Sequence, residues 1–191
     1  MTFNKQSNFY EKVLDKEEIF NGKVFSVEKA KVELMDGSIS SREMVFHHGG
    51  ACILAIDADR NIYLVKQYRI SVKQDLLEIP AGKLEKGEDH FSCAKRELYE
   101  ELGMTAKNWS LLSEFFPTPG YCSERIKIYL ARNLTIGENK LDPGEFLEVK
   151  KIHLTEALKM IKNKQIVDSK TMIAILLADQ ILREDENIFE Q

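Results

Sequence analysis

Three glutamates, Glu97, Glu100 and Glu101, have the residue type and spacing best suited to chemistry in this chain. If the segment around them is helical, spacings of three and four place the carboxylates on neighbouring positions of one flank. Carboxylates held so close repel one another, and a cation must offset their charge. Oxygen ligands at this spacing suit a hard divalent ion, Mg²⁺ or Mn²⁺. The glutamates therefore predict a metal site, and the metal points to phosphate chemistry.

A helix is predicted over this segment from its periodicity and its end residues. Asp89 suits the N-cap position and Gly103 the C-terminal turn. Arg96 lies one turn before Glu100 and can pair with it. The apolar residues that recur at helical spacing, and that we expect to face the core, are Phe91, Ala94, Leu98 and Leu102.

The glutamates belong to a longer frame, residues 82–104, which read GKLEKGEDHFSCAKRELYEELGM. An acidic surface helix is the ordinary interpretation of clustered glutamates, but it does not require the rest of this frame. The frame is similar to the Nudix box, Gly-x5-Glu-x7-Arg-Glu-U-x-Glu-Glu-x-Gly-U, where U is a bulky apolar residue. Every specified position of the box is filled. By this resemblance the chain is identified as a Nudix hydrolase.

Segments outside the frame resemble the ADP-ribose pyrophosphatase branch of that family. They are residues 66–69, 77–81 and 118–120, and Pro119 matches a proline usually found shortly after the box in that branch. The resemblance implies hydrolysis of ADP-ribose to AMP and ribose 5-phosphate with Mg²⁺, or with Mn²⁺ in its place. Three alternatives stay open: another nucleoside diphosphate sugar such as GDP-mannose, a dinucleotide such as NADH, and a non-catalytic ADP-ribose sensor.

The same resemblance implies a catalytic and metal-binding set. Glu145 matches a loop glutamate that binds metal and acts as the base, with Glu148 as its nearest competitor. The implied catalytic residues are Glu97, Glu101, Arg96 and Glu145. The implied metal ligands are Ala81 through its carbonyl, Glu97, Glu100, Glu101 and Glu145.

Substrate contacts are also implied by the resemblance. Phe25 matches an aromatic residue that stacks on adenine, and Arg42 and Arg69 match residues that grip the diphosphate. The residues that match the ribose end are Glu78, Gly120 and Glu124. Ordinary structural alternatives stay open: Phe25 as a core residue, the two arginines as surface charges, Gly120 as a turn residue and Glu145 as a loop carboxylate.

The chain has 191 residues and a formal net charge of −4. That length suits one domain with a real core, with or without a small extension. The mild negative charge argues against a nucleic-acid partner, and an anionic substrate then needs local cations. The N-terminus lacks the apolar core of a signal peptide, and we expect a cytoplasmic protein with no membrane partner. Three cysteines without metal-site spacing fit free thiols in a reducing compartment.

Mixed strands with few, late helices predict an α+β fold. By resemblance we expect the Nudix α/β/α sandwich with a mixed sheet over residues 45–191. We also expect an N-terminal tail and antiparallel β unit over 1–44 that builds a homodimer. Asp36-Gly37 predicts a hairpin turn, and 133–146 a polar loop. Strands are expected at 10–20, 23–34, 39–47, 51–56, 62–68, 76–79, 109–116, 125–131 and 147–153, and later helices at 155–163 and 168–184.

Overall fold

A computed structural model describes residues 9–137 and 146–189 of the chain. Its backbone contacts separate into two compact units. The first unit holds the residues up to Gly49 together with Phe116–Arg125, and the second holds Gly50–Phe115 and the residues from Ile126 onward. The division into domains at 1–44 and 45–191 stays a prediction.

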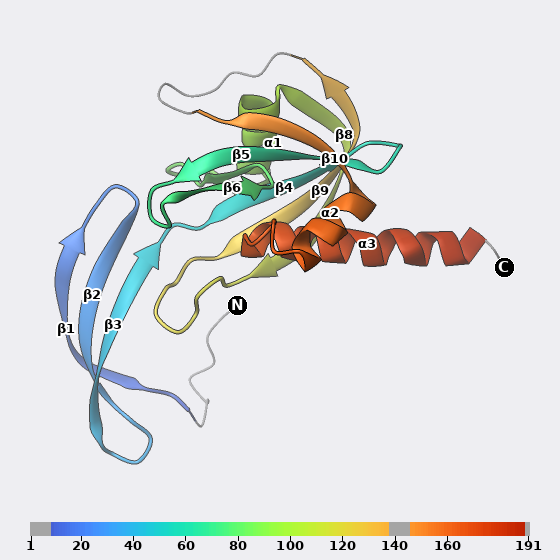
Figure 1. The fold of residues 1–191 in the computed structure, drawn as a ribbon. Coiled ribbons are helices and arrows are strands. Elements are labelled where there is room, and N and C mark those ends of the chain that lie inside the picture. Colours follow the sequence, from blue (N-terminus) through green and yellow to red (C-terminus); the bar gives the residue numbers. More distant parts are fainter. Residues whose placement is uncertain (1–8, 138–145, 190–191) are drawn as a thin grey trace. The chain divides into compact units, whose positions relative to one another are not determined.

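The first unit is a three-stranded antiparallel sheet in the order β1-β2-β3 (Figure 1). Gly37 has a φ of 80° and closes the turn between the second and third strands with a hydrogen bond from its N–H to the Leu34 carbonyl at 2.9 Å. The predicted hairpin turn is therefore confirmed. The strands are β1 (Lys12–Asn21), β2 (Phe25–Glu33) and β3 (Ile39–His47).

Phe116–Arg125 belongs to the first unit because it hydrogen-bonds to β3. The Val45 N–H donates to the Tyr121 carbonyl at 2.7 Å, and the Ser123 N–H donates to the Val45 carbonyl at 2.9 Å. The sequence does not predict this pairing, because the segment carries turn residues and no alternating apolar pattern.

The second unit is built on a seven-stranded sheet with the order β10-β5-β4-β9-β8, in which β6 pairs with β5 and β7 pairs with β4. The β4–β9 pair is parallel and the other pairs are antiparallel, so the predicted mixed sheet and α+β class are confirmed. Its strands are β4 (Gly50–Ile56), β5 (Asn61–Arg69), β6 (Gln74–Glu78), β7 (Ala81–Lys83), β8 (Met104–Phe115), β9 (Ile126–Ile136) and β10 (Glu148–His153). Its helices are α1 (His90–Leu102), α2 (Leu154–Lys162) and α3 (Ser169–Phe189).

Both faces of this sheet are covered, as in an α/β/α sandwich. Alternate residues of β4 show this directly, because successive strand residues point to opposite faces. Ala51 and Ile53 pack with the apolar side of α1, whereas Cys52 and Leu54 pack with residues of α2 and α3. Every residue of β4 is buried, which explains its uninterrupted apolar sequence. The predicted sandwich is confirmed for this unit (Figure 1).

The helix that carries the glutamates begins and ends where the sequence predicts. Asp89 accepts hydrogen bonds from the N–H groups of Phe91 and Ser92 at 2.9 and 3.1 Å. Gly103 adopts a left-handed conformation with φ of 64° and closes the C-terminal turn. The expected apolar stripe is also correct, since Ala94, Leu98 and Leu102 are buried and Phe91 packs against the same cluster. These contacts fix which flank of α1 carries the glutamates.

The structure differs from the sequence-based prediction at β7, at the start of β8, at the end of β9 and at the end of α3, which continues to Phe189. The short strand β7 lies inside the segment expected to be a loop, and β8 begins at Met104. Strand β9 continues to Ile136, so the loop expected over 133–146 is wrong at its start, and 138–145 lie outside the described residues. Met104 pairs with Ile136 through the backbone although Met104 is buried and Ile136 is exposed, and such a pair leaves little apolar pattern in the sequence. No helix in the described part of the chain is long and apolar enough to cross a membrane.

Candidate active site

Helix α1 buries two of its three glutamates. Glu97 is 8% exposed and Glu101 is 4% exposed, while Glu100 is partly exposed. Burying a carboxylate is costly unless cations or hydrogen-bond donors compensate for lost hydration. The groups around Glu97 and Glu101 therefore decide what this flank of the helix can do.

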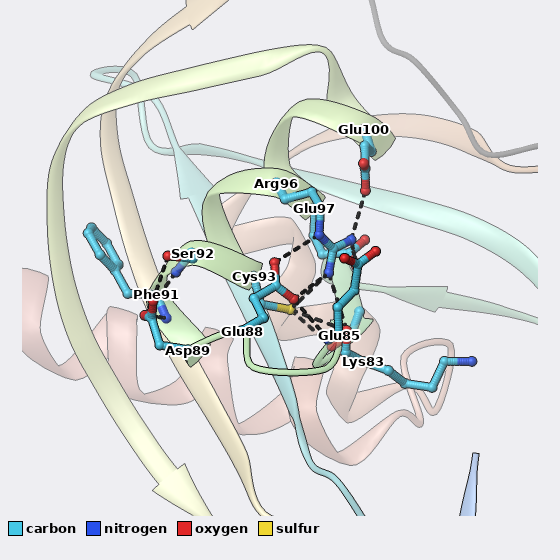
Figure 2. A network of polar contacts seen from close by, with 11 residues as sticks. Lys83, Glu85, Glu88, Asp89, Phe91, Ser92, Cys93, Arg96, Glu97 and Glu100 are labelled. Carbon is cyan, nitrogen blue, oxygen red and sulfur yellow. Dashed lines mark hydrogen bonds and ion pairs between the residues drawn. The ribbon is translucent and has the colours of Figure 1, made fainter. Parts of the chain in front are cut away.

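Arg96 is the first compensating group, and it pairs with three carboxylates at once (Figure 2). Its Nη1 lies 2.6 Å from Glu97 Oε1 and 2.9 Å from Glu100 Oε2. Its Nε and Nη2 bind the two carboxylate oxygens of Glu88 at 3.0 and 2.9 Å. The predicted pair with Glu100 is confirmed. The pairs with Glu88 and Glu97 were not predicted, although all of these residues belong to the same frame.

The contacts of Arg96 also set the charge states around it. Hydrogen bonding to Glu88 is the main cause that raises the pKa of Arg96 above its ordinary value. The same bond lowers the pKa of Glu88. Burial raises the pKa of the Cys93 thiol to about 12, so the thiol stays neutral at pH 7 and contacts the Gly82 and Lys83 carbonyls at 3.6 Å each. The cluster is thus one permanent cation among carboxylates.

The backbone of β7 lies directly against the buried carboxylates. The Ala81 N–H donates to Glu101 Oε2 at 3.2 Å. A Cβ added at Gly82 would lie 1.5 Å from Glu97 Oε1, so only glycine leaves room for that carboxylate. Strand β7 is held there by pairing with β4, where Cys52 opposes Ala81. The backbone of β7 at Gly82 and the acidic flank of α1 therefore form one oxygen-rich cradle.

These oxygen donors fit a hard divalent cation. The two buried glutamates and the adjacent Ala81 backbone offer only oxygen ligands, which Mg²⁺, Mn²⁺ and Ca²⁺ prefer. Within residues 9–137 and 146–189, no three Asp, Glu, His or Cys side chains are gathered as a complete metal site. Arg96 draws Glu97 and Glu100 toward itself. Glu145, the remaining predicted ligand, lies outside the described residues.

A second charged cluster joins two of the predicted substrate residues. Arg69, at the end of β5, binds Glu78 of β6 through two hydrogen bonds, from Nε at 2.7 Å and from Nη2 at 2.9 Å. Glu78 is 1% exposed and also contacts the Lys170 ammonium of α3. Burial alone would raise the pKa of Glu78, but the hydrogen bonds from Arg69 and Lys170 outweigh it and the pKa is lowered. The sequence offered no sign of Lys170, because it lies 92 residues from Glu78.

The other predicted substrate residues belong to the first unit. Phe25 is 41% exposed, which excludes the alternative of a buried core residue, and its ring lies 5.6 Å from that of Phe20. Arg42 Nε lies 2.8 Å from Glu11 Oε2. Glu124 Oε1 lies 3.4 Å from His47 Nδ1, and a Cβ added at Gly120 would meet nothing within 4 Å. Their roles toward a substrate stay predictions.

Glu148, the competitor of Glu145 for the role of base, is exposed and paired. It opens β10, where it lies opposite Lys66 of β5. Its carboxylate contacts the Lys150 ammonium, and this hydrogen bond is the main cause that lowers its pKa. A carboxylate already bound to a lysine is a poorer proton acceptor than an unpaired one.

Comparisons with known proteins agree with this geometry. A family model described as the NUDIX domain matches residues 46–173. The chain is 42% identical to a Bacillus subtilis (strain 168) protein named ADP-ribose pyrophosphatase, over 86% of this chain and 90% of that one. It is 43% identical to a Bacillus methanolicus protein named methanol dehydrogenase activator, over 87% and 91%. The crystal structure of an ADP compounds hydrolase superposes with a TM-score of 0.82 over 94% and 98% of the two chains; at 21% identity it supports the fold alone.

Substituting Gly82 by alanine should disrupt the cradle. The new Cβ would occupy the place of the Glu97 carboxylate, so we expect divalent-ion affinity measured by calorimetry to fall at least about tenfold. Gly87→Ala, in the loop between β7 and α1, is the matched control, since its φ of 84° makes it strained but nothing lies within 4 Å of the added Cβ. That control should cost about 1 kcal/mol of stability and leave ion affinity unchanged. Equal ion affinities of the two variants would contradict the cradle.

Proposed function

The chain belongs to the NUDIX family of hydrolases, and on this premise we propose that it hydrolyses the diphosphate bond of ADP-ribose. Water attacks one phosphorus, the P–O–P bond breaks, and the products are AMP and ribose 5-phosphate. The observation that carries the hydrolytic part is the pair of buried carboxylates on α1 against the backbone of β7. The identity to an ADP-ribose pyrophosphatase along most of the chain supports the choice of substrate.

Mg²⁺ is the proposed ion, with Mn²⁺ as a substitute. Glu97 and Glu101 would hold it, with Glu100 and the Ala81 carbonyl as further ligands. When bound, such an ion supplies neutralising charge at the diphosphate oxygens and makes the attacking water more acidic. Arg96 stays positively charged, and its ion pairs with Glu97 and Glu100 hold these two side chains in place on α1. The helix thereby presents its carboxylates in a fixed orientation.

The diphosphate needs cations from the protein as well, because the chain as a whole is negatively charged. Arg69 supplies one, and Arg42 is the proposed second. The guanidinium group of an arginine matches two phosphate oxygens and binds them through charge-assisted hydrogen bonds. In the described structure both arginines pair with carboxylates, Arg69 with Glu78 and Arg42 with Glu11. These pairs fix the orientation of each guanidinium before a substrate arrives.

Proton transfer is assigned to Glu145. It would accept the proton of the attacking water, as a general base does. The exposed ring of Phe25 is proposed to stack on adenine, and Gly120 and Glu124 to line the ribose end. Stacking does not read the identity of a base, so this contact alone does not distinguish ADP-ribose from GDP-mannose.

A homodimer is proposed from the surface of the first unit. Every residue of β1 is exposed, and its large apolar side chains include Val13, Ile19 and Phe20. Exposed apolar strands of this kind are typical of surfaces that bind another chain. Sedimentation equilibrium should give twice the mass of the 22.0 kDa chain, and the mass of a single chain would exclude the dimer.

The substrate assignment is tested by turnover on a panel of nucleotides. With Mg²⁺ present, kcat/KM should be at least about tenfold higher for ADP-ribose than for GDP-mannose or NADH. Removing the ion with a chelator should abolish turnover, and adding Mg²⁺ back should restore it. A higher kcat/KM for GDP-mannose or NADH would change the assigned substrate but not the assignment as a hydrolase. Binding of ADP-ribose without any turnover would instead favour a sensor.

Paired substitutions test the assignment of the base. Glu145→Gln should lower kcat by about 10²-fold or more with little change in KM, because the loss falls on proton transfer. Glu148→Gln, which removes an exposed carboxylate paired with Lys150, should stay near the wild-type rate. A raised KM with unchanged kcat in Glu145→Gln would limit Glu145 to binding. The opposite ranking of the two variants would assign the base to Glu148.

A further inference from the structure

Lys170 is a buried cation that the proposed reaction does not use. It lies in the first turn of α3, and its side chain is only 13% exposed. Its ammonium contacts the Glu78 carboxylate and lies 2.8 Å from Asp168 Oδ1. Lysine is almost never buried without a carboxylate partner, and here it has two. Its position therefore depends on both of them.

Glu78 connects this lysine to Arg69. Glu78 Oε1 accepts from Arg69 Nε, and Glu78 Oε2 accepts from both Arg69 Nη2 and the Lys170 ammonium. Two parallel hydrogen bonds fix the plane of the Arg69 guanidinium. Nη1 takes no part in them and has no hydrogen-bond acceptor among the described residues. The bidentate pair thus orients the guanidinium and leaves one nitrogen for a further acceptor.

Charge balance requires the lysine. The cluster contains the carboxylates of Glu78 and Asp168 and the cations Arg69 and Lys170, and the charge of the nearby Glu101 carboxylate also acts on Arg69. Burial alone would lower the pKa of Lys170, but Asp168 and Glu78 raise it, so the ammonium stays charged. Without that ammonium, the carboxylates of Glu78 and Asp168, together with the charge of Glu101, would face one guanidinium. Arg69 would then be fully neutralised, and the cluster would repel a diphosphate.

The start of α3 holds Lys170 in place. Asp168 Oδ2 accepts hydrogen bonds from the N–H and the hydroxyl of Thr171 at 3.0 and 2.6 Å. The Thr171 hydroxyl in turn accepts from the Ile79 N–H at 2.8 Å. Ile79 follows Glu78 directly in the chain. The first turn of α3 is therefore fixed to the same backbone that carries Glu78.

We propose that Lys170 is a positioning residue for the substrate diphosphate, acting on Arg69 through Glu78. Lys170 shares the charge of Glu78, so that Arg69 keeps both a fixed orientation and a net attraction for phosphate oxygens. This inference rests on the proposed function, because it takes Arg69 as the residue that grips the diphosphate. It also gives Glu78 a role in orienting Arg69 in place of the direct ribose contact implied by resemblance.

A double-mutant cycle on the full chain, with ADP-ribose and Mg²⁺, tests this role. Lys170→Met should raise KM about tenfold with a smaller change in kcat, because it misplaces a binding group. In an Arg69→Met background the same substitution should change KM less than about twofold, since its target is gone. Lys170→Arg, which keeps the cation, should recover most of the loss. Ile175→Val, at a fully buried position on the same helix, is the control for lost stability and should keep the wild-type KM.

Two outcomes overturn the positioning role while wild-type turnover holds. One is a KM of Lys170→Met equal to that of Ile175→Val. The other is a full effect of Lys170→Met in the Arg69→Met background, which would mean that Lys170 acts independently. A second double-mutant cycle combines Glu78→Gln with Arg69→Met and does not depend on Lys170→Met being folded. Additive effects of these two substitutions on KM would also overturn the proposal. Absence of wild-type turnover on ADP-ribose contradicts the proposed function itself.

Discussion

The burial of two carboxylates on one helix is the constraint on which the site depends. Glu97 and Glu101 lie against the sheet, where each lost hydrogen bond to water must be replaced. The structure replaces them with bonds from the Arg96 guanidinium and the Ala81 N–H, and Gly82 leaves the room that the Glu97 carboxylate needs. Caps at both ends of α1 and the apolar stripe against β4 keep the helix in the one rotation that permits this. A divalent ion adds the positive charge that a single arginine does not supply.

A second cluster of buried charges is also compensated, but by side chains alone. In it the two cations Arg69 and Lys170 pair with the two carboxylates Glu78 and Asp168, with no need of a metal ion. The two clusters lie on consecutive parts of one chain segment, because Glu78 ends β6 and Ala81 begins β7. The Ile79 N–H is held by Thr171 of α3 and the Ala81 N–H by Glu101 of α1. Helices on opposite faces of the sheet therefore position both the acidic flank of α1 and the cluster proposed to hold the diphosphate.

The sequence predicted the parts of the site that local spacing determines. The α1 caps follow from the residue types at its two ends, and its buried stripe and the Arg96–Glu100 pair follow from spacings of three and four residues along one helix. Contacts between residues far apart in the sequence could not be predicted from it. Lys170 contacts Glu78 across 92 residues, and the segment at Tyr121 hydrogen-bonds to β3 through backbone groups that any residue carries. Strand β9 ran past its predicted end for the same reason, since its last pairs are backbone contacts between residues that range from buried to exposed.

Calorimetric titration of Mg²⁺ into the chain, in the presence of a non-hydrolysable ADP-ribose analogue, tests the central claim most directly. Wild-type protein should take up the ion saturably, and Glu101→Gln, which keeps the shape of a side chain that is 4% exposed, should lose most of that uptake while staying folded. Glu85→Gln, at an exposed glutamate of the neighbouring loop, should bind like the wild type. Saturable uptake of equal strength in Glu101→Gln, or none in the wild type, would contradict the account.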